Sequence, residues 1–190
     1  GGYGAMMHAL MHPDIWSAAA CHSGDMGFDL MFAADFAHTL RRIAKHGGTI
    51  ESFMTAFEAS LKPAGDDIHA LMILAMAATY DPDPDAFLGI KLPVTMDTCE
   101  MDPVAWERWK KWDPLELVET RSEGLKTMKA LYIDCGDVDQ YNLVYGARRM
   151  HKRLTALGVD HVYQEFPDDH SSVDYRMDVS LPILSKALAD

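Results

Sequence analysis

Apolar residues form three short runs that have the length and composition of β-strands. They cover residues 16–21, 130–134 and 161–166, and loop residues bound each of them. Between the second and third runs, apolar residues recur at helical spacing over residues 143–157, and Gly158 supplies a C-terminal stop. This order predicts a βαβ unit with parallel strands and a right-handed crossover.

The remaining segments are helical in pattern. A last helix is expected over residues 172–188, kinked or broken at Pro182. The segment from about residue 27 to residue 120 has apolar stripes at helical spacing and no clear strand. We therefore predict an α/β fold of parallel strands with flanking helices and a helical insertion over about 27–120. Beside a parallel sheet, such an insertion is often a lid over a site at the carboxyl ends of the strands.

The stripes in the insertion are typical of core packing. The first runs from Phe28 to Ile43, the second from Ile50 to Leu61, and a third helix is expected over residues 66–80. Further along, Asp102 and Pro103 form a helix-starting pair that precedes Trp106, Trp109 and Trp112. Spacing by three favours packing for these tryptophans, with a substrate pocket as the alternative function of Trp106 and Trp109.

Composition narrows the class of protein. The chain has 190 residues, of which 48% are hydrophobic and 24% charged, as in a globular domain. Its formal net charge of -12 disfavours binding to nucleic acid or to anionic membranes. The most apolar stretch, residues 70–78, is too short to span a bilayer. The three cysteines are far apart and predict neither a disulfide framework nor a zinc site.

Two loops carry the residues with the clearest chemical potential. Asp139 follows the second predicted strand and His170 follows the third. Parallel strands bring their carboxyl ends to one edge, so a carboxylate could orient an imidazole that acts as general base toward a hydroxyl. The alternative is a surface aspartate and a solvent-exposed histidine. His8 and His12 share a helical spacing but lack a third ligand, so no metal site is predicted.

The first residues add a second signal. Gly1-Gly2-Tyr3-Gly4-Ala5 precedes an Ala- and Met-rich helix, and together with the order of motifs that follows it resembles the α/β-hydrolase superfamily. The resemblance is to the esterase branch that includes esterase D, S-formylglutathione hydrolases and feruloyl esterases. Members carry G-x-S-x-G-G-Y-G-A at the nucleophile elbow, of which Gly1 matches the last glycine of G-x-S-x-G. The likeness covers essentially all 190 residues.

The resemblance implies a role for individual residues. Asp139 would be the catalytic aspartate, with Asp137 and Asp134 as weaker candidates, and His170 the catalytic histidine. Gly1, Gly2 and Tyr3 would lie near the elbow and the oxyanion hole. The nucleophilic serine would stand two positions before Gly1, outside this chain.

Ser23 is interpreted differently from the elbow serine. It lacks the leading glycine of the elbow motif and is expected in the loop after the first strand, where it could approach the pocket.

The expected activity is that of a serine carboxylesterase acting on an acyl or aryl ester through an acyl-enzyme, without a cofactor. The alternatives are a non-catalytic binding module, or a thioesterase or acyltransferase on the same scaffold. The expected partner is a small-molecule ester, with a companion N-terminal polypeptide or a homo-oligomer as further options, and the chain alone is expected to be inactive. No leader peptide is recognisable, which gives a weak preference for the cytoplasm and leaves localisation open.

Overall fold

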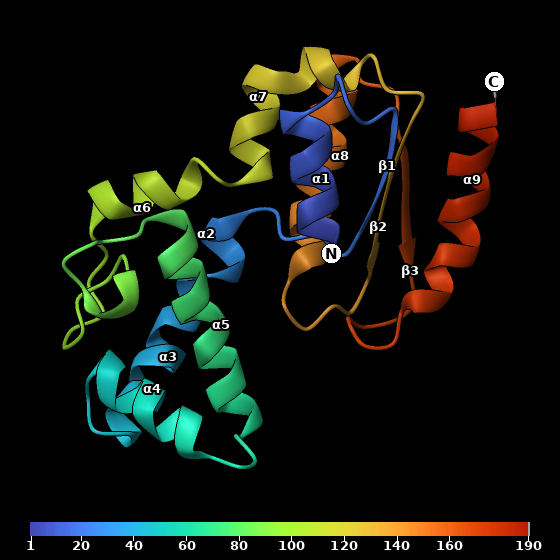
Figure 1. The fold of residues 1–190 in the computed structure, drawn as a ribbon. Helices are drawn as coiled ribbons and strands as arrows, with labels where there is room; N and C mark the ends of the chain where they lie inside the picture. Colours follow the sequence, from blue (N-terminus) through green and yellow to red (C-terminus); the bar gives the residue numbers. More distant parts are fainter. Residues whose placement is uncertain (190) are drawn as a thin grey trace. The chain divides into compact units, whose positions relative to one another are not determined.

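The chain forms two compact units (Figure 1). The computed structural model describes residues 1–189. One unit contains Gly1–Met31 and the chain from Asp113 onward, and the other contains Phe32–Trp112. The second unit thus begins about five residues later, and ends about eight residues earlier, than the insertion expected from the sequence.

The first unit is built on three parallel strands. These are β1 (Ala18–His22), β2 (Ala130–Gly136) and β3 (Val162–Phe166), and they pair in the order β1-β2-β3. All three predicted strands and the parallel βαβ unit are confirmed. β1 starts two residues later than predicted because Trp16 remains outside the ladder, with its ring against His8. β2 runs two residues further because Cys135 and Gly136 still pair with β3.

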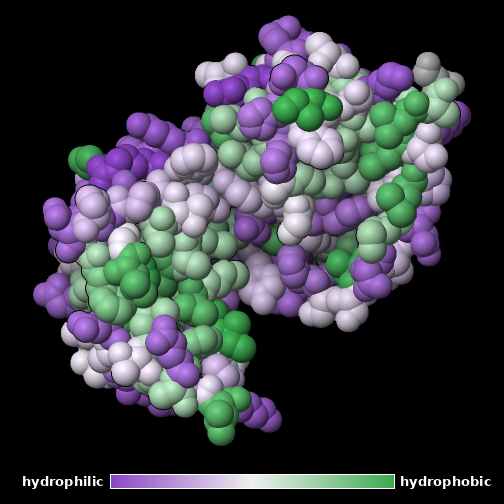
Figure 2. Space-filling view, in the orientation of Figure 1, coloured by the Kyte–Doolittle hydropathy of each residue, from purple (hydrophilic) through white to green (hydrophobic). Residues whose placement is uncertain are grey.

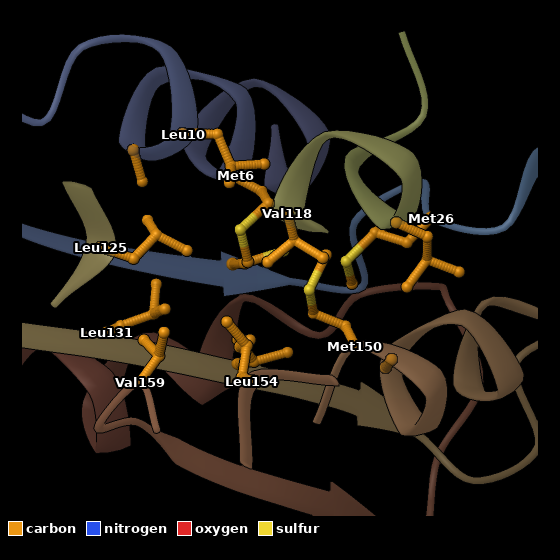
Figure 3. Close-up of a cluster of buried hydrophobic side chains, with 14 of the residues drawn as sticks. Met6, Leu10, Met26, Val118, Leu125, Leu131, Met150, Leu154 and Val159 are labelled. Carbon is orange, nitrogen blue, oxygen red and sulfur yellow. The ribbon is translucent and has the colours of Figure 1, made fainter. Parts of the chain in front are cut away.

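Helices cover both faces of this sheet (Figure 1). One face carries α1 (Gly2–Met11), α7 (Pro114–Leu125) and α8 (Leu143–Leu157), and the other carries α9 (Met177–Ala189). The apolar side chains of the first face form a continuous core, in which residues of α1 and α7 meet those of β2 and α8 (Figure 3). Burial of these side chains is the main force that holds the helices on the sheet.

The C-terminal segment differs in part from the prediction of one helix over residues 172–188. A loop comes first, then the 3₁₀ turn η2 (Asp174–Arg176), and only then α9. Pro182 lies inside α9 without ending it. Leu181 and Leu188 are exposed on this helix, and Figure 2 shows hydrophobic surface along it.

The second unit is helical, as predicted. Its elements are α3 (Ala33–Lys45), α4 (Ile50–Ala59), α5 (Gly65–Tyr80), η1 (Phe87–Gly89) and α6 (Pro103–Lys110). The first apolar stripe is divided, because its start forms the short helix α2 (Phe28–Met31) in the first unit. Among residues 1–189 we find no helix long and apolar enough to cross a membrane.

An aromatic cluster forms the centre of the second unit. The Trp109 ring is fully buried and makes edge contacts with Phe32, Phe36 and Tyr80, at centroid distances of 5.8, 5.4 and 5.3 Å. Trp106 is half-buried and packs edge-on against Phe36. Such edge-to-face contacts add to the stabilisation from area burial. Trp109 is therefore a core residue, and a role for these tryptophans in a pocket stays a prediction.

Asp113 ties two segments of the first unit together. Its buried carboxylate caps α7 through Leu115 N at 2.9 Å and also accepts hydrogen bonds from Gly27 N at 3.0 Å and Phe28 N at 2.7 Å. Burial raises the pKa of Asp113, and the three N–H donors oppose that rise by stabilising the charged form. One side chain therefore fixes both the start of α7 and the start of α2.

We expect Asp113→Ala to lower the free energy of unfolding by about 2–4 kcal/mol, because it removes a helix cap and leaves two further buried N–H groups without an acceptor. Urea denaturation would measure the change. Asp102→Ala is the matched control, since Asp102 also caps a helix that begins with proline but is exposed and bonds only Val104 N and Ala105 N. Its cost should be about 1 kcal/mol. Equal losses in the two variants would contradict the proposed tie to α2.

Candidate active site

The carboxyl ends of the three strands bring three loops to one edge of the sheet. Each loop contains a non-glycine residue in the left-handed region: Ser23 (φ 44°) after β1, Asn142 (φ 63°) after β2 and Ser172 (φ 56°) after β3. Such conformations cost about 1–3 kcal/mol each and persist where surrounding contacts enforce them. The concentration of strained backbone at this edge favours a functional site there.

Asp139 and His170 meet at this edge, as the sequence predicted. His170 Nδ1 lies 2.9 Å from Asp139 Oδ2. The Asp139 side chain is fully buried, whereas 38% of the His170 side chain is exposed. Within residues 1–189 no hydrogen bond is found for His170 Nε2, so this nitrogen is available to a substrate or a nucleophile. A buried carboxylate that orients a half-exposed imidazole is the geometry of a general base and its positioning group.

Backbone hydrogen bonds hold the loop that carries Asp139. The other carboxylate oxygen of Asp139 accepts hydrogen bonds from Tyr141 N at 2.9 Å and Leu143 N at 3.4 Å. These bonds direct Oδ2 toward His170. The Tyr141 ring also packs edge-on against the imidazole, with centroids 5.1 Å apart.

The loops after β2 and β3 are joined to each other. Asp137 N donates to Phe166 O at 2.9 Å, and His170 N donates to Gln140 Oε1 at 2.9 Å. Gly136 makes the close approach possible, because a Cβ at this position would lie 2.1 Å from Asp168 O. The separation of Asp139 and His170 is therefore set by the strand pairing and not by the two side chains alone.

The structure distinguishes the three aspartates proposed for the catalytic role. Asp137 is exposed, and no contact with His170 is found for it among the described residues. Asp134 is buried, but its carboxylate bonds His22, Tyr132 and Arg176. Of these three aspartates, only Asp139 is found within hydrogen-bond distance of His170 in the described chain.

The first helix begins at the same edge. Gly2 lies so close to the loop after β1 that a Cβ there would be 2.2 Å from His22 O and 2.8 Å from the Gly24 backbone. This contact explains the glycine at position 2, whereas Gly1 and Gly4 have open space around them. The Tyr3 ring packs against Phe28. The expected position of Gly1, Gly2 and Tyr3 near an elbow remains a prediction.

The hydroxyl of Ser23 and the thiol of Cys135 lie near the site but are poor nucleophiles. Ser23 is buried, and within residues 1–189 no hydrogen-bond partner is found for its Oγ. Burial, followed by the nearby Asp139 charge, raises the pKa of the Cys135 thiol to about 12, so this thiol remains protonated at neutral pH. Nucleophilic catalysis requires an exposed side chain that is hydrogen-bonded to a general base, and neither Ser23 nor Cys135 meets this requirement.

Asp25 is a further charged residue near the site, and the sequence reasoning did not identify it. It lies half-buried in the loop after β1, within electrostatic range of His170 and Asp139. Burial raises the pKa of Asp25, while the nearby His170 acts in the opposite direction. In the sequence, only the position of Asp25 after a predicted strand could have indicated a role at the site. Many ordinary turns also place an aspartate after a strand, so this position is not specific.

Comparisons with known proteins indicate a family for this chain. The sequence profile of the family described as "Putative esterase" matches residues 1–181. Among solved structures, the crystal structure of esterase E22 matches with a TM-score of 0.43 and 15% sequence identity, over 100% of this chain and 57% of that one. The chain thus spans a little more than half the length of esterase E22. A comparison with curated proteins gives no match.

We expect Asp25→Asn to stabilise the protein near pH 7 and to have a smaller effect near pH 4. Burial raises the pKa of Asp25 in the folded state, so the unfolded chain ionises first as the pH rises. The folded state therefore loses stability from about pH 4 up to its own raised pKa, and a neutral asparagine avoids this loss. Urea denaturation at the two pH values would measure it, with Asp14→Asn as the control at an exposed position. A lower free energy of unfolding for Asp25→Asn than for the parent at pH 7 would contradict a raised pKa for Asp25.

Proposed function

The chain belongs to the putative esterase family, and we propose that His170 and Asp139 are two members of a Ser-His-Asp triad that hydrolyses carboxylic esters. The observation that carries this proposal is the hydrogen bond of 2.9 Å between His170 Nδ1 and the buried carboxylate of Asp139. The bond leaves Nε2 directed away from Asp139, where a serine hydroxyl or a water molecule can reach it.

The proposed reaction has two steps. His170 Nε2 removes the proton of the attacking serine hydroxyl, the serine oxygen bonds to the acyl carbon, and the leaving alcohol takes the proton from the imidazolium. In the second step His170 removes a proton from water, whose oxygen bonds to the acyl carbon; the bond from that carbon to the serine oxygen breaks, the serine takes the proton from the imidazolium, and the acid is released. Asp139 holds the imidazole with Nδ1 protonated and stabilises the imidazolium in both steps.

The nucleophile is assigned to the serine of the elbow motif, two positions before Gly1. Two observations support this place. The N-terminus of α1 packs through Gly2 on the loop after β1. That loop also carries Asp25, which interacts electrostatically with His170. A residue just ahead of Gly1 would therefore enter the same edge of the sheet. Backbone N–H groups at the start of a helix also favour a developing oxyanion.

The same residues could serve thioester cleavage or acyl transfer, because these reactions share the acyl-enzyme. A binding module without catalysis would keep the scaffold but would not need an oriented imidazole with a free Nε2. The Asp139–His170 geometry therefore favours the enzyme over the binding module.

We expect a chain that carries the elbow serine ahead of Gly1 to hydrolyse short-chain p-nitrophenyl esters. His170→Ala and Asp139→Asn should each lower kcat by about 10³- to 10⁴-fold, because the first removes the base and the second removes the group that fixes its tautomer. Stopped assays of p-nitrophenol release would give the rates.

Two matched variants control for nonspecific damage. Asp137→Asn changes an exposed aspartate two residues from Asp139. His161→Ala removes a histidine that lies just before β3, where it contacts His151. Both should retain kcat within about twofold, since neither contacts His170. Full activity in His170→Ala would refute the proposed mechanism, and a loss in Asp137→Asn equal to that in Asp139→Asn would refute the choice of aspartate.

A further inference from the structure

A row of polar side chains crosses the sheet just before the strands end. His22 of β1, Asp134 of β2 and Gln164 of β3 are register partners, so their side chains project from the same face. Contacts with α9 and η2 identify this face as the one opposite the main core. Polar groups in such a position are costly unless all of them are paired.

Arg176 completes the row. Its Nε donates to Asp134 Oδ2 at 2.9 Å, and one terminal nitrogen donates to Tyr132 OH at 2.8 Å and to Gln164 Oε1 at 2.7 Å. The guanidinium also lies 4.5 Å from the centre of the Phe166 ring. Only 12% of this side chain is exposed, so the arginine is fixed by contacts with β2 and β3.

Asp134 is the charge that Arg176 neutralises. The carboxylate is fully buried, and it also accepts hydrogen bonds from Tyr132 OH at 2.9 Å and interacts with His22 Nδ1 at 2.7 Å. Burial and then the hydrogen bond to Asp134 raise the pKa of Tyr132 to about 12, so the phenol keeps its proton and acts as a donor. The two charged groups of this network, Asp134 and Arg176, are therefore paired with each other.

His22 extends this network to α9, because its Nε2 lies 2.9 Å from Ser180 Oγ. Ser180, His22 and Asp134 thus have the distances of a catalytic triad. Two features argue against catalysis here: Ser180 is only 1% exposed, and the Asp134 charge is already neutralised by Arg176. These contacts hold α9 against the sheet.

The network lies next to the segment that carries His170. This segment leaves β3 at Phe166, passes through His170 and Ser172, and enters η2, where Arg176 is the last residue. Arg176 lies at the end of this segment and its guanidinium contacts Phe166 at the start. Its side chain therefore joins the two ends of the segment. Tyr175 OH adds a hydrogen bond of 3.0 Å to Asp168 Oδ2 within the same loop.

We propose that Arg176 is a positioning residue for His170, acting through the closure of this loop onto β2 and β3. The proposal rests on the proposed function, in which His170 is the general base. A loop fixed at both ends samples fewer conformations, so the imidazole spends more time at hydrogen-bond distance from Asp139. Arg176 does this without touching the reacting atoms.

The test compares Arg176→Lys and Arg176→Gln in the chain that carries the elbow serine. We expect kcat for p-nitrophenyl acetate to fall by about 10²-fold in Arg176→Gln while KM stays within about twofold, because orientation of the base is lost and substrate binding is not. Arg176→Lys retains the charge opposite Asp134 and should stay folded. It should lose less kcat than Arg176→Gln because it keeps this charge, but some loss should remain, since the compact ammonium lacks the planar fork with which the guanidinium bonds Asp134, Tyr132 and Gln164.

Arg148→Gln is the matched control. Arg148 makes an equally close bidentate pair with Glu165 of β3, at 2.8 and 2.6 Å, but it is exposed and lies away from the polar row. Its kcat should stay within about twofold of the parent. Circular dichroism and thermal unfolding at the assay temperature show which variants are folded, and if Arg176→Gln is unfolded the comparison uses Arg176→Lys.

A double-mutant cycle with Asp139→Asn separates positioning from general stabilisation. If both residues act by orienting His170, Arg176→Lys should lower kcat much less in the Asp139→Asn background than in the parent. The positioning role would be overturned if Arg176→Lys lowered kcat by the same factor in both backgrounds. It would also be overturned if Arg176→Lys and Arg176→Gln had the same kcat as Arg148→Gln. Failure of the proposed function is seen separately, because His170→Ala would then be as active as the parent.

Discussion

The pairing of β2 with strands on both sides is the constraint on which the candidate site depends. Because β2 is central and both its neighbours are parallel to it, the loops carrying Ser23, Asp139 and His170 leave the sheet at one edge. The same register places His22, Asp134 and Gln164 side by side. A shift of one residue in either ladder would move these polar groups to the opposite face and separate Asp139 from His170.

Charged groups in the first unit fall into two kinds. Asp134 is fully buried and Arg176 largely buried, and the two form an ion pair, which is the arrangement expected of groups that hold elements together. Asp25 is instead half-buried with its pKa raised, and His170 is half-exposed with one nitrogen available. Unfavourable burial and unused hydrogen-bonding capacity are typical of functional sites, where stability is lower than the fold could provide.

Much of this arrangement could be predicted from the sequence. The three strands, the βαβ unit and the helices between the first two strands follow from apolar periodicity. The order of strands and loops predicted that Asp139 and His170 could meet but left a surface aspartate and an exposed histidine as the alternative, and the resemblance to the esterase branch favoured the pair. The contacts of Arg176 and His22 could not be predicted, because His22 and Asp134 lie 112 positions apart and only the strand register makes them neighbours. The division of the first insertion stripe at Phe32 was missed for a similar reason, since Asp113 fixes the start of α2 from a distant segment.

The left-handed backbone conformation of Ser172 has to be maintained by contacts of the surrounding loop, and the polar row supplies some of these contacts. A left-handed serine two residues after His170 would relax toward ordinary backbone angles if the loop were free, and the imidazole would move with it. The loop is held on one side by the bond from His170 N to Gln140 and on the other by the contacts of Arg176. Arg176 bonds residues of both β2 and β3. The loop that carries His170 is therefore anchored to β2, the strand that leads into the Asp139 loop. The two residues thus keep their distance through the sheet, so the hydrogen bond between them needs little further ordering of the loop.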